Sequence, residues 1–139
     1  MSENHIRSIS TTLALLDKAL CDFEQWARGH EVRSVLHEVR NPLSAAQREL
    51  IGREVPAMKG ILGDVQARLN LEISVQSADK MITGSCAVLW AWLRELEHRH
   101  LGSYGEVPAG LSEYLDPKVA ELIRHLSNIV EAVAKGGLR

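Results

Sequence analysis

Residues that interrupt regular helices are scarce in this chain, with glycine occurring 10 times and proline 4 times in 139 residues. This scarcity excludes a collagenous or loop-rich protein. No apolar run reaches the roughly 18 residues that a membrane-spanning helix needs. The polar residues Ser2–His5 are not followed by a continuous apolar stretch, so we expect no secretory signal. We therefore expect a cytoplasmic protein that does not enter the membrane.

Cysteine is also scarce, and neither sign of charge predominates. Cys21 and Cys86 lie in stretches with helical periodicity and have no CxxC partner, so we interpret them as reduced core residues. Lys and Arg number 16 against 18 Asp and Glu, which gives a formal net charge of −2. The basic residues are scattered and form no basic face of the kind that nucleic-acid binders use. We expect no binding to nucleic acid.

Apolar residues, at 45 % of the chain, recur mostly at intervals of three and four, the period of an α-helix. Charged residues make up 24 %, and this balance is typical of a folded chain, not of a disordered one. The length fits one domain. The sequence predicts a single all-α domain over residues 1–139, an antiparallel bundle of four to five helices with one or more of them kinked at proline.

The first helix is predicted over residues 4–28. Its apolar residues form a strict heptad seam, which favours lengthwise packing against another helix: Ile6, Ile9, Leu13, Leu16, Leu20, Phe23 and Ala27. Gly29 follows the seam and is a suitable residue to end the helix. Because the seam is longer than a small monomer needs, we expect a homodimer.

Residues 30–71 carry two further apolar series with the same spacing. The series are Val32, Leu36, Val39, Leu43, Ala46, Leu50 and then Ile51, Val55, Met58, Leu62, Val65, Leu69. Because the first series continues across Pro42, we expect a helix that is kinked there. At Pro56, close to Gly52, a kink and a break both remain open.

The C-terminal half is predicted to hold two more helices. The first covers about residues 77–101, with Ser74 and Ser77 as N-cap candidates. Trp90 points away from its inner face, which indicates a second contact surface unless the last helix covers it. The last helix is predicted to begin with Asp116 as N-cap and Pro117 in the first helical position. Residues 102–116, which are rich in glycine, are predicted to form a long irregular connection.

The segment with the strongest chemical content begins at His37. A neutral histidine can act as a nucleophile toward a phosphoryl group when a neighbouring acceptor such as Glu38 orients its ring proton. Arg40 and Asn41 offer donors for phosphoryl oxygens or for an attacking water. A kink at Pro42 would let the histidine side chain reorient.

The segment Val35–Ala46 resembles the phosphoacceptor box of sensor histidine kinases, in their dimerisation and phosphotransfer domain. The resemblance implies that His37 is the phosphoacceptor, that Glu38 assists it, and that Arg40 and Asn41 modulate transfer or dephosphorylation. It also implies a dimeric four-helix bundle and a response-regulator-like partner. The family's ATP-binding domain has no counterpart here, so this chain would receive and pass on a phosphoryl group without taking it from ATP.

Two alternatives remain open. In the first, the chain is a structural or adaptor bundle that binds a helical partner protein and carries out no chemistry at His37. In the second, Glu95, His98 and His100 bind a metal through Glu-x-x-His pairs, although a second such pair on another helix is missing. No catalytic constellation is complete and no cofactor is indicated. We therefore expect a non-catalytic signalling or scaffold protein.

Overall fold

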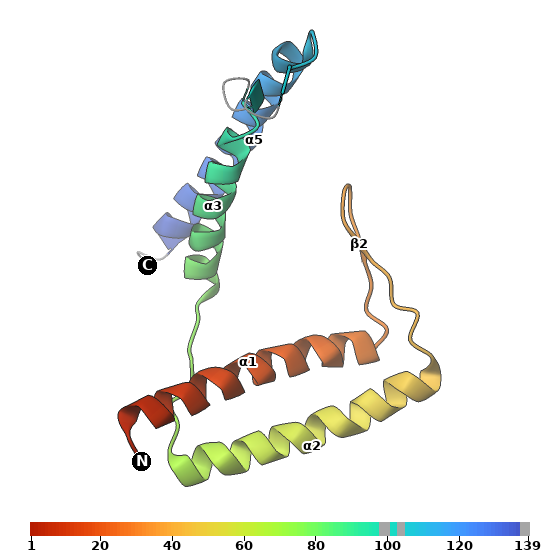
Figure 1. Cartoon of the computed structure of the whole chain (residues 1–139), viewed down its shortest axis with the longest axis vertical. Helices are drawn as coiled ribbons and strands as arrows, with labels where there is room; N and C mark the ends of the chain where they lie inside the picture. The colour runs from red at the N-terminus through yellow and green to blue at the C-terminus, as the bar shows by residue number, and fades with distance from the viewer. Residues whose placement is uncertain (98–100, 103–104, 137–139) are drawn as a thin grey trace. The chain divides into compact units, whose positions relative to one another are not determined.

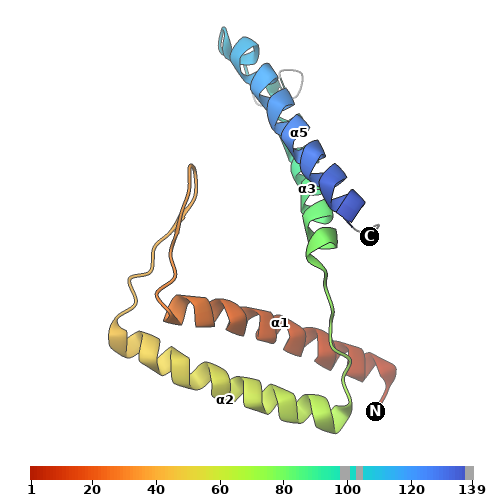
Figure 2. The same cartoon turned by 180° about the vertical axis from the view of Figure 1, so that it is seen from behind.

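The computed structural model describes residues 1–97, 101–102 and 105–136. They form two compact units, Met1–Ser74 (the N-terminal unit) and Val75–Arg139 (the C-terminal unit). Within each unit, two long helices lie side by side and run in opposite directions (Figures 1 and 2). The mainly helical class is confirmed, and a single domain over the whole chain stays a prediction.

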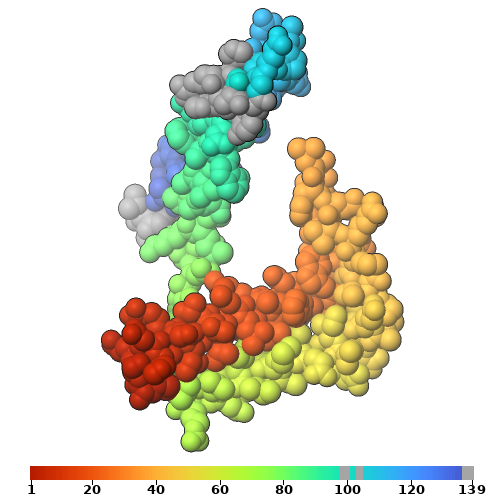
Figure 3. All heavy atoms as spheres, viewed as in Figure 1, coloured from red at the N-terminus to blue at the C-terminus, as the bar shows by residue number. Residues whose placement is uncertain are grey.

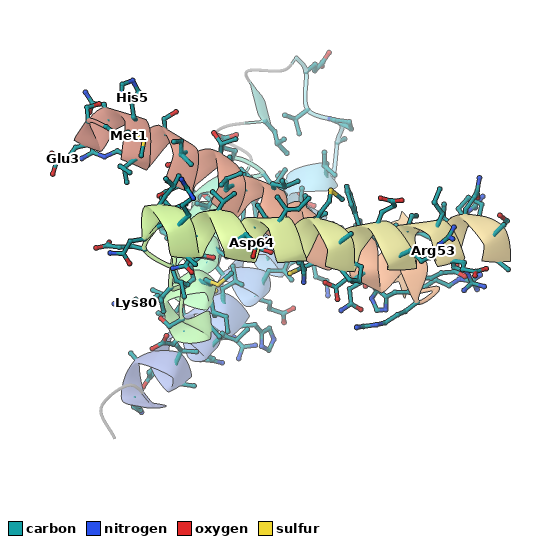
Figure 4. All side chains as sticks on the ribbon, turned by 90° about the horizontal axis from the view of Figure 1, so that it is seen from below. Met1, Glu3, His5, Arg53, Asp64 and Lys80 are labelled. Atoms are coloured by element: carbon teal, nitrogen blue, oxygen red, sulfur yellow. The ribbon has the colours of Figure 1, made fainter. Side chains whose placement is uncertain are left out.

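Helix α1, Glu3–Ala27, matches the helix predicted over residues 4–28. It begins after Ser2, whose hydroxyl oxygen accepts a hydrogen bond from the backbone N–H of His5 at 3.2 Å (Figure 4 labels His5). This bond satisfies one of the free N–H groups of the first turn. Gly29 follows the helix with a φ of +83°, a conformation that costs glycine little.

After α1 the structure departs from the predicted helix. Strands β1 (Val32–Arg33) and β2 (Glu38–Val39) pair as a small antiparallel sheet, so the all-α prediction needs this correction. Helix α2 covers Ala45–Leu69. Pro42 therefore lies outside the helices, and the kinked helix predicted there is wrong. By contrast, α2 continues through Pro56 without a break.

Local sequence sets the start of α2. The Ser44 hydroxyl accepts from the backbone N–H of Gln47 at 3.1 Å, and the Gln47 side chain accepts from the backbone N–H of Ser44 at 2.9 Å. This reciprocal capping box fixes a helix start. Pro42 disfavours helical backbone at Asn41, the residue before it. The two features together keep the segment before Ser44 out of the helix.

The two helices of the N-terminal unit are joined by an apolar seam and an ion pair. The α2 residues predicted to face the core are half-buried or buried: Ile51, Val55, Met58, Leu62, Val65 and Leu69. Leu20 on α1 is fully buried, and Val55 is 2 % exposed. Lys59 on α2 pairs with Glu24 on α1 and donates to Cys21 Sγ at 3.7 Å. Much of the α1 seam is therefore packed within the chain itself.

The C-terminal unit consists of α3 (Ala78–Arg94) and α5 (Leu111–Gly136). Helix α3 is shorter than the helix predicted over residues 77–101. Helix α5 begins inside the 102–116 segment that we predicted to be irregular, so Pro117 lies within the helix and not at its first position. A proline at this point removes one backbone hydrogen bond near the helix start.

The core of the C-terminal unit is small. Among its described residues, Cys86 and Val119 are the buried ones. Cys86 is thus a core residue as predicted, whereas Cys21 in the other unit is exposed, contrary to prediction. None of the helices in the described ranges has the length and apolar content to cross a bilayer.

Candidate functional site

The residues with predicted chemistry lie on a β-hairpin that projects from the N-terminal unit (Figure 3). Its register aligns Val32 with Val39. The backbone N–H of Ser34 donates to the His37 carbonyl oxygen at 2.9 Å and closes the turn. Val35–Leu36 are left as the two residues of the turn, and we call this pair the tip.

The tip is apolar and almost wholly exposed. Val35 is 93 % exposed and Leu36 is 98 % exposed. Two-residue turns usually carry Asn, Asp or Gly because these residues tolerate positive φ. Among the described non-glycine residues, positive φ occurs only at Asn70, so both tip residues have ordinary backbone angles. Neither turn geometry nor burial explains why two aliphatic side chains stand here.

The predicted phosphoacceptor, His37, lies at the end of the turn and not on a helix. Glu38, its predicted helper, is the next residue along the extended chain, and successive side chains of a strand point to opposite faces. Glu38 Oε1 instead accepts a hydrogen bond from Arg40 Nε at 3.1 Å. The helix that the phosphoacceptor resemblance implies is therefore not the conformation that this segment adopts.

Asn41 has a structural task at the base of the hairpin. Its side-chain Nδ2 donates to the carbonyl oxygens of Trp26 at 2.7 Å and His30 at 3.1 Å. The Trp26 carbonyl oxygen also accepts from the backbone N–H of Gly29 at 3.0 Å, so Asn41 adds a second donor at the end of α1. Its Oδ1 accepts from the backbone N–H of Leu43 at 3.3 Å. One side chain thus fixes the returning strand to α1.

An open, mainly apolar pocket of about 540 Å³ lies where the hairpin joins the helices. It is lined by Phe23, Trp26, Leu43 and Ile51 together with the hairpin segment 39–42. His37 is not among the lining residues. The pocket therefore does not place the imidazole beside a cavity. Arg40, which lines the pocket, pairs with Glu38.

The ion pair between the helices is the clearest electrostatic feature of this unit. Hydrogen bonding to Lys59 holds the pKa of Glu24 below its ordinary value of 4.5. The same bond raises the pKa of Lys59 above 10.5. Arg28 Nη2 lies 3.6 Å from Glu24 Oε2 and adds to the positive field. These charges bind α2 to α1 and lie outside the hairpin.

Of the three predicted metal ligands, only Glu95 lies within the described residues. His98 and His100 lie outside the described residues, and Glu95 follows the last residue of α3. Among residues 1–97, 101–102 and 105–136, no group of three or more His, Cys, Asp or Glu side chains has the geometry to hold a metal ion.

The sequence draws attention to the segment around His37 but does not predict its extended conformation or its two most exposed residues. Val35 and Leu36 were interpreted as helical, and Leu36 as part of a buried face. The Ser44–Gln47 capping box is the signal that would have placed the helix start after Pro42. Comparisons with protein-family models, with curated proteins and with solved structures find no match to this chain.

Proposed function

We propose that this protein is a non-catalytic scaffold or adaptor that binds a partner protein through the hairpin tip, Val35–Leu36. The observation that carries the proposal is the exposure of these two aliphatic side chains, at 93 % and 98 %. Each Å² of apolar surface left in water forgoes about 25 cal/mol of burial free energy. Burial of the Val35 and Leu36 side chains in an apolar pocket of a partner protein would therefore favour binding.

The hairpin presents its tip in a defined conformation. Strand pairing and the two bonds from Asn41 order the backbone before any partner arrives. Preorganisation reduces the entropy that binding must overcome. The residues next to the tip, Arg33, His37 and Glu38, are polar and exposed, as the rim of an interface usually is. The partner that fits is a cytoplasmic protein with a small apolar pocket bordered by polar groups.

The test is a photo-cross-linking amino acid placed at Leu36 in the full chain, expressed in its native cell. We expect one discrete protein adduct, and we expect the added change Val35→Asp to abolish it. The matched control carries the same amino acid at Leu15, which is 61 % exposed on α1. An adduct pattern at Leu36 that equals the Leu15 pattern would refute tip binding.

Phosphotransfer through His37 is the second candidate, and the exposed position of this residue at the hairpin favours it, because a phosphodonor can reach it. In this case the protein would exchange a phosphoryl group with a response-regulator-like partner. Incubation with acetyl phosphate should then give an acid-labile adduct that His37→Gln abolishes and Glu38→Gln weakens. Tip binding alone predicts no adduct.

A further inference from the structure

Helix α3 carries an apolar stripe that its own unit does not cover. No charged residue occurs between Lys80 and Arg94. Within this stretch Met81, Val88 and Trp92 are 53 %, 47 % and 63 % exposed, and Ser85 is exposed as well. These four residues are spaced by four, three and four positions, which is the heptad spacing of a helix-packing seam. We call them the α3 stripe.

The α3 stripe faces away from the residue that α3 buries. At about 100° per residue, Val88 lies about 160° around the helix from Cys86, and Trp92 about 120°. Cys86 is the buried residue of α3 and lies beside Leu126 of α5 in the groove between the helices. Helix α5 therefore occupies one side of α3, and the stripe occupies another.

A helix that is apolar on more than one side is found in the interior of bundles. Helices α3 and α5 bury only Cys86 and Val119 among their described residues, so the two helices alone do not form such an interior. We propose that a second copy of this chain covers the α3 stripe, with the two α3 helices antiparallel about a two-fold axis. The two copies of α3 and α5 then form a four-helix bundle.

The spacing of the stripe is the same in both directions, so two antiparallel copies match in register. Met81 meets the second copy's Trp92, which is a favourable thioether–aromatic contact. Ser85 meets the second copy's Val88, a small residue against a larger one. Gly84 lies beside the stripe with open space around its Cα, which permits a close approach of the two helices.

Charge favours the antiparallel arrangement over the parallel one. Glu95 continues the spacing of the stripe, three residues after Trp92. In the antiparallel pair it meets the second copy's Ala78, the first residue of α3, where the positive end of the helix dipole attracts a carboxylate. In a parallel pair the two Glu95 side chains would face each other and repel.

The exposed apolar side chains supply part of the area that a dimer interface buries. A stable interface removes about 800 Å² from each partner. An aromatic side chain offers about 150–250 Å², so the exposed part of Trp92 supplies roughly 100–150 Å². Ile82, Leu89 and Leu96 border the stripe on one side, each 40–41 % exposed, and extend the surface that the second copy would bury.

This proposal does not depend on tip binding, because it concerns the other unit. The test is sedimentation velocity of the full chain across the micromolar range. We expect wild type to be a dimer and Val88→Asp to be a monomer of unchanged helix content, with dimerisation weakened more than about 100-fold by the buried charge. Should Val88→Asp fail to fold, Val88→Ala is expected to weaken dimerisation while it keeps its helix content.

The matched control is Val35→Asp, the same change at an exposed valine of the N-terminal unit, which should stay dimeric. A monomeric wild type would overturn the proposal, and so would equal dissociation of the Val35→Asp and Val88→Asp variants. Orientation is tested in a Cys21→Ser background by mixing Met81→Cys and Trp92→Cys proteins. We expect disulfide-linked dimers only from the mixture, because like positions in an antiparallel pair lie about 16 Å apart along the axis. Cross-linking of each variant with itself would contradict the antiparallel pair.

Discussion

The two units are both antiparallel helix pairs, but they differ in how completely each pair satisfies itself. In the N-terminal unit, Leu20, Val55 and Leu71 are buried, and a Lys59–Glu24 ion pair joins the helices. In the C-terminal unit, α3 has no charged residue between Lys80 and Arg94, and its burial is limited. A helix pair that buries its apolar seam and is joined by an ion pair needs no further partner. A helix that also exposes a second apolar stripe is stabilised by packing against another helix.

The units also expose their apolar residues differently. The N-terminal unit concentrates two of its most exposed apolar side chains at one projecting point, Val35–Leu36. The C-terminal unit spreads its exposed residues along the length of α3. The two residues of the tip can insert into a pocket of another protein, whereas the α3 stripe can pack lengthwise against another helix. This contrast separates the two binding surfaces that we propose.

The largest expected effect is loss of the N-terminal core. Leu20→Ala should lower the free energy of unfolding by about 2–5 kcal/mol, because Leu20 is 0 % exposed and its truncation leaves a cavity. Leu15→Ala on the same helix, at 61 % exposure, is the control and should change it by about 0.5 kcal/mol or less. Urea unfolding followed by circular dichroism measures both, and equal losses would contradict the described packing.

The next effect concerns the base of the hairpin. Asn41→Ala removes the donor to the Trp26 and His30 carbonyl oxygens and should cost about 0.5–1.5 kcal/mol. The amides of β1 and β2 should then exchange with solvent faster, while those of α2 stay protected. Hydrogen exchange by mass spectrometry measures this. Arg40→Ala, which removes only an exposed ion pair, should leave the exchange pattern nearly unchanged.

A smaller effect is the pH dependence of the Lys59–Glu24 pair. Since the pKa of Glu24 is lowered on folding, its contribution is complete above pH 4.5 and is lost as pH falls through the folded-state value. Since the pKa of Lys59 is raised, its contribution is complete below pH 10.5 and is lost above the folded-state value. Glu24→Gln should therefore flatten the acid limb of unfolding free energy against pH. An unchanged acid limb would contradict the pair.

The smallest effect on stability should come from the tip. The double change Val35→Asn and Leu36→Gly supplies residues that favour hairpin turns, so unfolding should stay within about 0.5 kcal/mol of wild type. Binding to the partner should be lost all the same. Urea unfolding measures the stability of this variant, and the cross-linking assay measures its binding to the partner. Retained cross-linking would contradict tip binding.

Much of the helical framework was predictable, because long amphipathic periods are the strongest signal in a sequence. Helix α1 and the buried face of α2 from Ile51 to Leu69 follow from apolar spacing alone. Helix ends were less predictable. Helix α5 begins at Leu111, before Asp116, so Pro117 does not mark the helix start, although proline is favoured at the first helical position.

The hairpin could not be predicted from spacing. Val32, Leu36 and Val39 fall at helical intervals, yet Val32 and Val39 also align as a cross-strand pair. A turn made of Val and Leu carries none of the usual turn residues, so nothing within the turn itself contradicted the helix. The same ambiguity affects the candidate site, because the phosphoacceptor resemblance implies a helical backbone at His37 and Glu38.

The account depends most on the conformation of residues 32–39. Nuclear magnetic resonance of the full chain measures it directly through contacts between backbone protons. We predict cross-strand contacts between Val32 and Val39 and β-type chemical shifts at Arg33 and Glu38. Continuous helical contacts from Val32 across Pro42 into α2 would contradict the hairpin and would restore His37 to the helix that the phosphoacceptor resemblance requires.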